Sequence, residues 1–193
     1  MGKIKVTETN LTDVKLIEPS VFGDHRGFFT ESYSEKDFKD GGIHYDFIQD
    51  NHSLSAEAGV IRGLHFQNGA SAQTKLIRVV SGVVLDVIVD IRKGSPTYAQ
   101  WEGYILSEYN HRQLLVPKGY AHGFMTLTPN VNFLYKCDNY YDGAADAGIA
   151  FDDPDLGITW PMSIDKAILS EKDQQHPTLK EFESINPFVY GEI

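Results

Sequence analysis

The sequence has a single cysteine, Cys137, so an intramolecular disulfide framework or a structural zinc site built on thiols is excluded. Basic residues are also scarce, because 17 Lys and Arg stand against 27 Asp and Glu and give a formal net charge of −10. We therefore expect no broad basic surface for nucleic acid. No apolar run approaches the length of a membrane span, and the first residues lack the apolar core of a secretory signal. We expect a cytoplasmic protein.

Glycine-rich phosphate-binding loops are missing as well. There is no Gly-x-Gly-x-x-Gly or Walker-type sequence, which argues against a dinucleotide-binding or P-loop fold. A ligand that carries phosphate would have to be held by arginine and lysine side chains. Arg26 lies in a turn flanked by glycines and Arg62 in a strand-like run otherwise without charge, but on local sequence alone each fits a surface or structural cation slightly better.

The chain shows no linker, internal repeat or low-complexity tract, so we expect one domain over residues 1–193. Many short runs of β-branched and aromatic residues, separated by turn residues and without alternating helices, predict an all-β sandwich or jelly roll. The mouth between the two sheets of such a fold is the expected ligand site. The runs are 14–17, 28–33, 45–50, 60–66, 75–80, 83–91, 100–106, 113–116, 122–126 and 132–136, and only 34–39 and the segment after Ser163 look helical.

The clearest local prediction is a hairpin. Runs 75–80 and 83–91 are joined by Ser81 and Gly82, and a two-residue turn that contains glycine favours an antiparallel pair. In the second run the apolar residues at alternate positions share one face, whereas the other face carries two aspartates interrupted by Ile88. We therefore expect both faces of this strand to be partly covered.

The segment 62–67, Arg-Gly-Leu-His-Phe-Gln, contains the most informative histidine. Strand alternation places His65 on the face opposite to Arg62, Leu64 and Phe66. A lone histidine on a strand is more often a structural residue than a catalyst, so the interpretation depends on which other polar groups accompany it.

Two further polar residues lie on apolar strand faces. Lys75 shares a face with Ile77, and Tyr135 shares one with Phe133. A lysine in such a position is costly unless it is paired or faces a cavity. Together with His65, these residues are candidates for one shared cavity.

A metal site is the main alternative, because double-stranded β-helix proteins often bind a metal through two histidines separated by one residue. Here the segment reads His65-Phe66-Gln67, so the second imidazole is missing and we expect no catalytic metal.

Without a metal, acid–base catalysis is the remaining chemistry that these side chains can perform. A histidine can take a proton near neutral pH, a lysine can stabilise an oxyanion, and a tyrosine can return a proton. That set suits proton abstraction next to a carbonyl group.

Seven stretches cover nearly the whole chain in order and carry a family resemblance. They are FGDHRGFFTESY (22–33), FIQDNHSLS (47–55), VIRGLHFQ (60–67), AQTKLIRVVSGVVLDVIVDIRKGSPTY (72–98), LLVPKGYAHGF (114–124), FLYKCDNYY (133–141) and ILSEKD (168–173). Together they resemble the dTDP-4-dehydrorhamnose 3,5-epimerases of the cupin superfamily. The resemblance implies a cupin-type jelly roll with a few short peripheral helices, and a homodimer in which N-terminal strands cross to the partner sheet.

The resemblance also implies catalytic roles. His65 corresponds to the family's base and Asp173 to the carboxylate paired with it, although Ser170 to Asp173 also fits a helix capping box on local sequence. Tyr135 corresponds to the general acid on the opposite side of the sugar, and Lys75 to the lysine near the C4 oxygen.

Binding residues are implied in the same way. Arg26 and Arg62 match family positions near the diphosphate. The positions near the nucleotide or sugar are matched by Glu31, Gln49 and Asn51. His122 and Lys172 match residues of the ligand pocket, and Tyr141 matches an aromatic residue beside the base. Gln49 and Asn51 fit a purely structural role in a strand equally well.

One stretch departs from the family pattern. Where members often have Tyr-x-Pro-x-x-Glu, this chain has Tyr141 followed by a loop that ends at Asp146. Loss of the proline predicts a more mobile 142–146 loop.

The implied reaction is epimerisation at C3 and C5 of a dTDP-linked 4-keto-6-deoxyhexose, which leads to dTDP-L-rhamnose. No metal or redox cofactor is expected, because the C4 ketone makes both neighbouring C–H bonds acidic. Three alternatives stay open on the sequence: an epimerase of one carbon or of another sugar nucleotide, such as a GDP-linked one; a ketoisomerase that shares the cupin fold; and a non-catalytic sugar-nucleotide or glycan-binding module.

Overall fold

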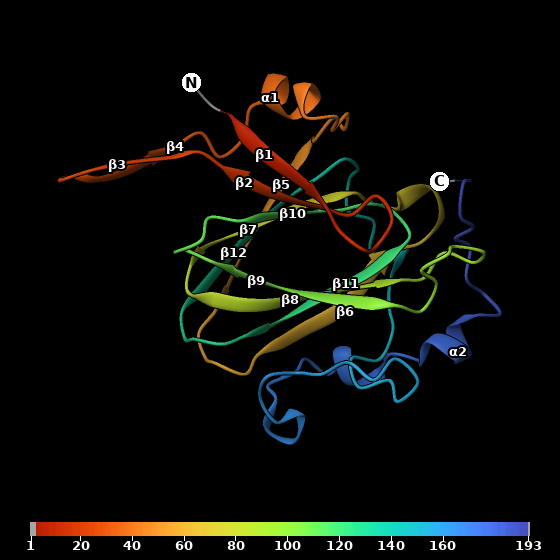
Figure 1. The fold of residues 1–193 in the computed structure, drawn as a ribbon. Coiled ribbons are helices and arrows are strands. Elements are labelled where there is room, and N and C mark those ends of the chain that lie inside the picture. The colour runs from red at the N-terminus through yellow and green to blue at the C-terminus, as the bar shows by residue number, and fades with distance from the viewer. Residues whose placement is uncertain (1–2, 193) are drawn as a thin grey trace.

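The chain folds into two facing antiparallel sheets with a projecting hairpin, and the computed structural model describes residues 3–192 (Figure 1). The six-stranded sheet has the order β1 (Ile4–Glu8), β2 (Lys15–Pro19), β10 (Gln113–Val116), β7 (Lys75–Ser81), β12 (Val131–Cys137) and β5 (Gln49–Ser55). The five-stranded sheet has the order β13 (Asp146–Gly148), β6 (Ile61–Gln67), β11 (Tyr120–Thr126), β8 (Val83–Asp90) and β9 (Trp101–Ser107). The predicted all-β jelly roll is confirmed.

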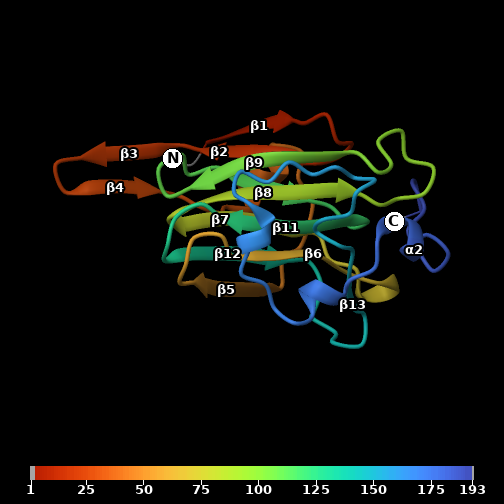
Figure 2. The same cartoon turned by 90° about the horizontal axis from the view of Figure 1, so that it is seen from below.

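The remaining elements are small and peripheral. Strands β3 (Val21–Asp24) and β4 (Gly27–Thr30) form a two-stranded arm that extends away from both sheets (Figures 1 and 2). Helix α1 (Glu35–Asp40) confirms the helix predicted at 34–39, and the Ser34 side chain caps its first turn. The segment after Ser163 is mostly irregular and contains only two 3₁₀ turns, Ile164–Lys166 and Asp173–Gln175, and the four-residue helix α2 (Leu179–Phe182). Within residues 3–192, no helix has the length and apolarity needed to cross a membrane.

The hairpin predicted at residues 75–91 is wrong. Strand β7 pairs with β10 and β12, whereas β8 pairs with β9 and β11 in the other sheet. Gly82 has φ +80° and marks the corner at which the chain passes from one sheet to the other. Val79 and Val84, on either side of this corner, both face the core between the sheets. A two-residue glycine turn is compatible with either arrangement, and burial of both valines favours the crossing.

Both faces of β8 are covered, as predicted. Val84 and Ile88 pack in the core between the two sheets, while Val87 and Val89 pack on the outer face against residues of the C-terminal segment such as Phe182. This segment crosses the outer face of the five-stranded sheet (Figure 1, blue). It is tied to the edge of β6 by two backbone hydrogen bonds, one donated by Ile61 to the carbonyl of Ile168 at 3.0 Å and one from Ile168 to Gly59 at 3.0 Å. The C-terminal segment is thereby held beside the cavity between the sheets.

Candidate active site

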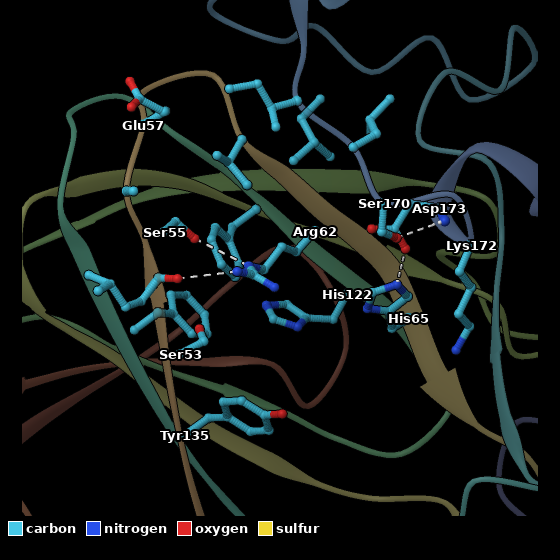
Figure 3. A pocket seen from close by; sticks show the side chains of 18 of the residues that line it. Ser53, Ser55, Glu57, Arg62, His65, His122, Tyr135, Ser170, Lys172 and Asp173 are labelled. Carbon is cyan, nitrogen blue, oxygen red and sulfur yellow. Dashed lines mark hydrogen bonds and ion pairs between the residues drawn. The ribbon is translucent and has the colours of Figure 1, made fainter.

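A cavity of about 550 Å³ opens between the two sheets, and the polar residues singled out in the sequence converge in it (Figure 3). His65 comes from β6 and His122 from β11, both in the five-stranded sheet, whereas Lys75 of β7 and Tyr135 of β12 come from the six-stranded sheet. The predicted convergence of His65, Lys75 and Tyr135 in one cavity is confirmed. Asp173 also lines it, from the C-terminal segment.

His65 is hydrogen-bonded to Asp173 across 108 residues of sequence, with 2.5 Å between Nε2 and Oδ1. The Asp173 side chain is only 4% exposed, whereas that of His65 is 31% exposed and reaches the cavity. Burial by itself would raise the pKa of Asp173, but the imidazoles of His176 and His65 outweigh it and hold that pKa well below its usual range. Asp173 is therefore ionised and accepts the Nε2 proton, which leaves the Nδ1 lone pair of His65 free to take a proton.

The capping interpretation of Asp173 is partly right. Its backbone N–H donates to Ser170 Oγ at 3.1 Å, as a cap requires, but its carboxylate bonds to His65 instead of to the backbone of the turn. The same residue thus closes a local turn and contributes its side chain to the cavity.

A second histidine–aspartate pair lies deeper. His122 Nε2 is 2.9 and 3.0 Å from the two carboxylate oxygens of Asp86, which is fully buried on β8. Burial raises the pKa of Asp86 and lowers that of His122, although each partner opposes the shift of the other. The sequence indicated His122 as a pocket residue through the resemblance, but it did not reveal Asp86 as its partner. The available signal was that the face of this strand that carries Ile88 also carries two aspartates, one of which is Asp86.

Lys75 and Tyr135 supply the other ionisable groups. Burial lowers the pKa of Lys75, against the attraction of nearby acidic groups that include Asp86, and among the described residues Lys75 forms no ion pair. Its Nζ lies 6.0 Å from the centre of the Tyr135 ring. Burial raises the pKa of Tyr135, so this phenol keeps its proton at neutral pH. A lysine amine and a protonated phenol therefore lie together across the cavity from the His65–Asp173 pair.

Arg62 lines the same cavity, so its predicted place opposite His65 is wrong. The register between β6 and β11 shifts from the pair His65–His122 to the pair Arg62–Phe124, so β6 carries one extra residue there. Gly63 within this bulge has φ +144°, and a Cβ on it would lie 2.5 Å from the Cα of Gly123. Because of the bulge, Arg62 and His65 lie on the same side of the strand although they are three positions apart. In this position the Arg62 guanidinium donates to Ser55 Oγ and to the Leu54 carbonyl, each at 3.2 Å.

Comparison with known proteins agrees with this geometry. A family model described as dTDP-4-dehydrorhamnose 3,5-epimerase matches residues 8–181. The chain belongs to this epimerase family. The dTDP-4-dehydrorhamnose 3,5-epimerase of Salmonella typhimurium is 50% identical over 175 residues, which are 90% of this chain and 94% of the relative.

Solved structures of epimerases share the fold. That of the Bacillus anthracis dTDP-4-dehydrorhamnose 3,5-epimerase, with TDP and PPi bound, has a TM-score of 0.88 and 58% identity, and the match covers 91% of this chain and 99% of that one. The Legionella pneumophila dTDP-6-deoxy-D-glucose-3,5-epimerase, in complex with dTDP-4-keto-L-rhamnose, has a TM-score of 0.91 and 43% identity, with coverage of 97% and 98%.

Three other residues singled out in this family member, Gln49, Asn51 and Tyr141, are not among the residues that line the cavity. Gln49 donates to Asn51 at 3.1 Å and accepts the backbone N–H of Tyr141 at 3.0 Å. The Tyr141 ring is largely exposed, and its hydroxyl donates to Asp146 at 3.0 Å. Asp146 also forms an ion pair with Lys172, so the loop that departs from the family pattern is linked to the turn that carries Asp173.

Arg26 and Glu31, on the projecting arm, also lie outside the cavity of their own chain. Arg26 is exposed at the tip of the β3–β4 arm, where it forms an ion pair with Asp24 at 2.5 Å. Glu31 follows β4 directly. Three phenylalanines on this arm are also exposed: Phe22, Phe28 and Phe29.

One residue that the sequence interpretation missed is His176. In the epimerase structure, donor atoms of His65, Asp173 and His176 all lie within 4.8 Å of one another, an arrangement that could hold a metal ion. The second imidazole that is missing next to His65 in the sequence is therefore supplied by a distant segment. The spacing Asp-x-x-His at 173–176 was the only sequence signal for it.

Proposed function

We propose that the protein epimerises dTDP-4-keto-6-deoxy-D-glucose at C3 and C5, to give the L-lyxo ketone that precedes dTDP-L-rhamnose. One observation carries the proposal. A base, His65 with Asp173, and a proton donor, Tyr135, come from opposing sheets and face one cavity (Figure 3). Inversion at carbon requires that a proton be removed on one face of the sugar and returned on the other.

In the first half of the reaction, His65 Nδ1 takes the proton from C5, and the electron pair of that bond moves into the C4 carbonyl to form an enolate. Asp173 stabilises the imidazolium that results, because it is ionised and already bonded to Nε2. Lys75 faces the same cavity and donates to the enolate oxygen; burial lowers its pKa, and the negative charge that develops on that oxygen favours its ammonium form.

In the second half, Tyr135 gives its proton to C5 on the opposite face, and the carbonyl re-forms. The raised pKa of the Tyr135 phenol ensures that the proton is present at neutral pH. His65 then loses its proton to solvent and Tyr135 regains one. The same sequence at C3, which also adjoins the ketone, completes the double epimerisation.

Binding of the nucleotide part is proposed for Arg62 at the cavity wall and for Arg26 and Glu31 from a second copy of the chain. An arm that carries exposed phenylalanines and an arginine but leaves its own cavity supports a homodimer in which each arm reaches the partner's site. Deletion of residues 1–33 that leaves a stable, fully active monomer would overturn this arrangement. The prediction of a cytoplasmic location belongs to the same proposal.

The test is turnover of dTDP-4-keto-6-deoxy-D-glucose, with the product identified by NMR. The proposal predicts inversion at both carbons. Inversion at one carbon would identify a mono-epimerase, and migration of the ketone would identify a ketoisomerase. Binding of the nucleotide without turnover would identify a binding module, and a preference for a GDP-linked sugar would overturn the assignment of the base.

A further inference from the structure

Behind the catalytic dyad, a second imidazole approaches the same carboxylate. His176 Nε2 lies 3.5 Å from Oδ1 of Asp173, and the rings of His65 and His176 are 5.5 Å apart between centroids and inclined by 74°. Asp173 therefore stands between two imidazoles, and the mechanism proposed above uses only one of them.

The position of His176 is built into the sheet. Its imidazole lies against Gly148 of β13, which pairs with His65 of β6. A Cβ on Gly148 would lie 2.6 Å from His176 Nε2, so the space for this ring exists only because residue 148 is glycine. The His176 side chain is 8% exposed, and within residues 3–192 its Nε2 makes no hydrogen bond of good geometry; the polar group that it faces is the Asp173 carboxylate, 3.5 Å away. A contact at that distance is weak, and a buried ring nitrogen of this kind is better satisfied by a ligand that binds it directly.

The three donor atoms form the ligand set of a divalent transition metal. Two imidazole nitrogens and a carboxylate oxygen suit zinc, cobalt, nickel or copper and do not suit magnesium or calcium. In a tetrahedral zinc site, bonds of about 2.0–2.2 Å place ligand atoms roughly 3.3–3.6 Å apart. Here the separations from Asp173 Oδ1 are 2.5 Å to His65 and 3.5 Å to His176. Side-chain movements of about 1 Å would admit an ion.

An ion can reach this cluster from two sides. His65 and Asp173 line the catalytic cavity, whereas His176 lines a separate hollow of about 500 Å³ that residues of β13 also line. That hollow is also lined by Asp146, Lys172 and Glu171. Asp146 and Lys172 form an ion pair, so Glu171 is the acidic group there that attracts a cation.

We propose that His65, Asp173 and His176 form an inhibitory binding site for a divalent ion of the zinc class. The ion takes the lone pair of Nε2 on each imidazole and one oxygen of Asp173. The proton that His65 Nε2 shares with Asp173 then moves to Nδ1, so no net proton is lost from the ring. Nδ1 becomes a donor and can no longer accept a proton from the sugar.

This site makes a specific kinetic prediction, which rests on the proposed function. The ion lies behind His65, on the side away from the sugar, and leaves the cavity open. Zinc should therefore lower kcat while KM stays unchanged. A metal bound in the cavity itself would instead raise KM.

The experiment uses the full-length protein after dialysis against a chelator, and it has two readouts. The first is direct binding of Co²⁺, followed by its visible absorption and by competition with Zn²⁺, which does not depend on turnover. The second is epimerase kinetics at controlled free Zn²⁺, with Mg²⁺ as the control ion. The variants are His176→Gln, with His176→Asn in reserve if the first does not fold, and His44→Gln as the matched control at an exposed histidine.

We expect saturable Co²⁺ binding that zinc displaces, and a fall in kcat with zinc but not with magnesium. In His176→Gln the affinity for both ions should fall at least about 10-fold, because one ligand is lost. His44→Gln should match the wild type. The proposal is overturned if the wild type shows no saturable Co²⁺ binding, if His176→Gln binds zinc as tightly as the wild type, or if zinc raises KM. If binding is found but no turnover is detected with any sugar nucleotide, the site stands and the proposed function fails.

Discussion

Replacement of Asp173 by asparagine tests how the base is oriented and charged. The carboxylate accepts the His65 Nε2 proton at 2.5 Å and is 4% exposed, so the bond is charge-assisted and little screened by water. Such a bond contributes about 1.5–3 kcal/mol. Loss of that stabilisation in the imidazolium-like transition state corresponds to a rate decrease of about 10- to 150-fold.

The asparagine adds a second effect. Its amide can turn its NH₂ group toward Nε2, which favours the tautomer with the proton on Nδ1 and removes the lone pair that acts as base. In serine proteases the equivalent change costs about 10⁴-fold in kcat. We therefore expect Asp173→Asn to lower kcat by about 10³- to 10⁴-fold and to change KM little.

The assay is initial-rate kinetics with the product measured by NMR, after circular dichroism has confirmed that the variant is folded. Asp50→Asn is the matched control, because Asp50 forms an exposed ion pair with Lys136 outside the cavity. Its kcat should stay within about 2-fold of the wild type. If Asp173→Asn keeps a tenth or more of wild-type kcat, the hydrogen bond to Asp173 is not what activates His65.

Three further predictions concern stability and reactivity. Because the folded-state pKa of Asp173 is held below its unfolded value of about 3.9, its ionised form stabilises the fold above that pH, and the contribution is lost as pH falls toward the folded pKa. The difference in unfolding free energy between wild type and Asp173→Asn should thus shrink as the pH falls below about 4, as urea titrations can show; a difference that grows over that range would contradict this sign. Gly63→Ala should lower the free energy of unfolding by at least about 1–3 kcal/mol, measured by thermal unfolding, because the added Cβ meets Gly123. Gly94 also has a positive φ, but a Cβ there meets no atom within 4 Å, so Gly94→Ala should lower the free energy of unfolding by less. Burial raises the pKa of Cys137 to about 11, so a thiol reagent at pH 8 should label the protein only after denaturation, and stoichiometric labelling of the native protein would refute its burial.

The sequence predicted the class of fold and most of the strands because alternation and turn residues are local signals. It failed where pairing is decided by burial at a distance. The Ser81–Gly82 turn looks like a hairpin turn, yet the chain crosses there to the other sheet so that Val79 and Val84 both enter the core. No property of the turn itself distinguishes the two outcomes.

In the candidate site, too, local features could be predicted from the sequence and long-range contacts could not. Alternation could place His65 on a face, but it assumed a regular strand, and one extra residue beside Gly63 brought Arg62 to the same side. Asp173 and His176 reach His65 only because the C-terminal segment is bonded to the edge of β6. Long-range contacts of this kind leave no periodic pattern, so Asp173 was found through family resemblance and His176 was not found.

The most direct test of the central claim is the exchange of substrate protons with solvent in D₂O, followed by NMR in two variants. His65 removes the proton and Tyr135 returns one, from opposite sides of one cavity. His65→Ala should therefore abolish deuterium incorporation at C3 and C5. Tyr135→Phe should abolish inversion while His65 still exchanges the proton on its own face. Deuterium incorporation at the wild-type rate in His65→Ala would contradict the account.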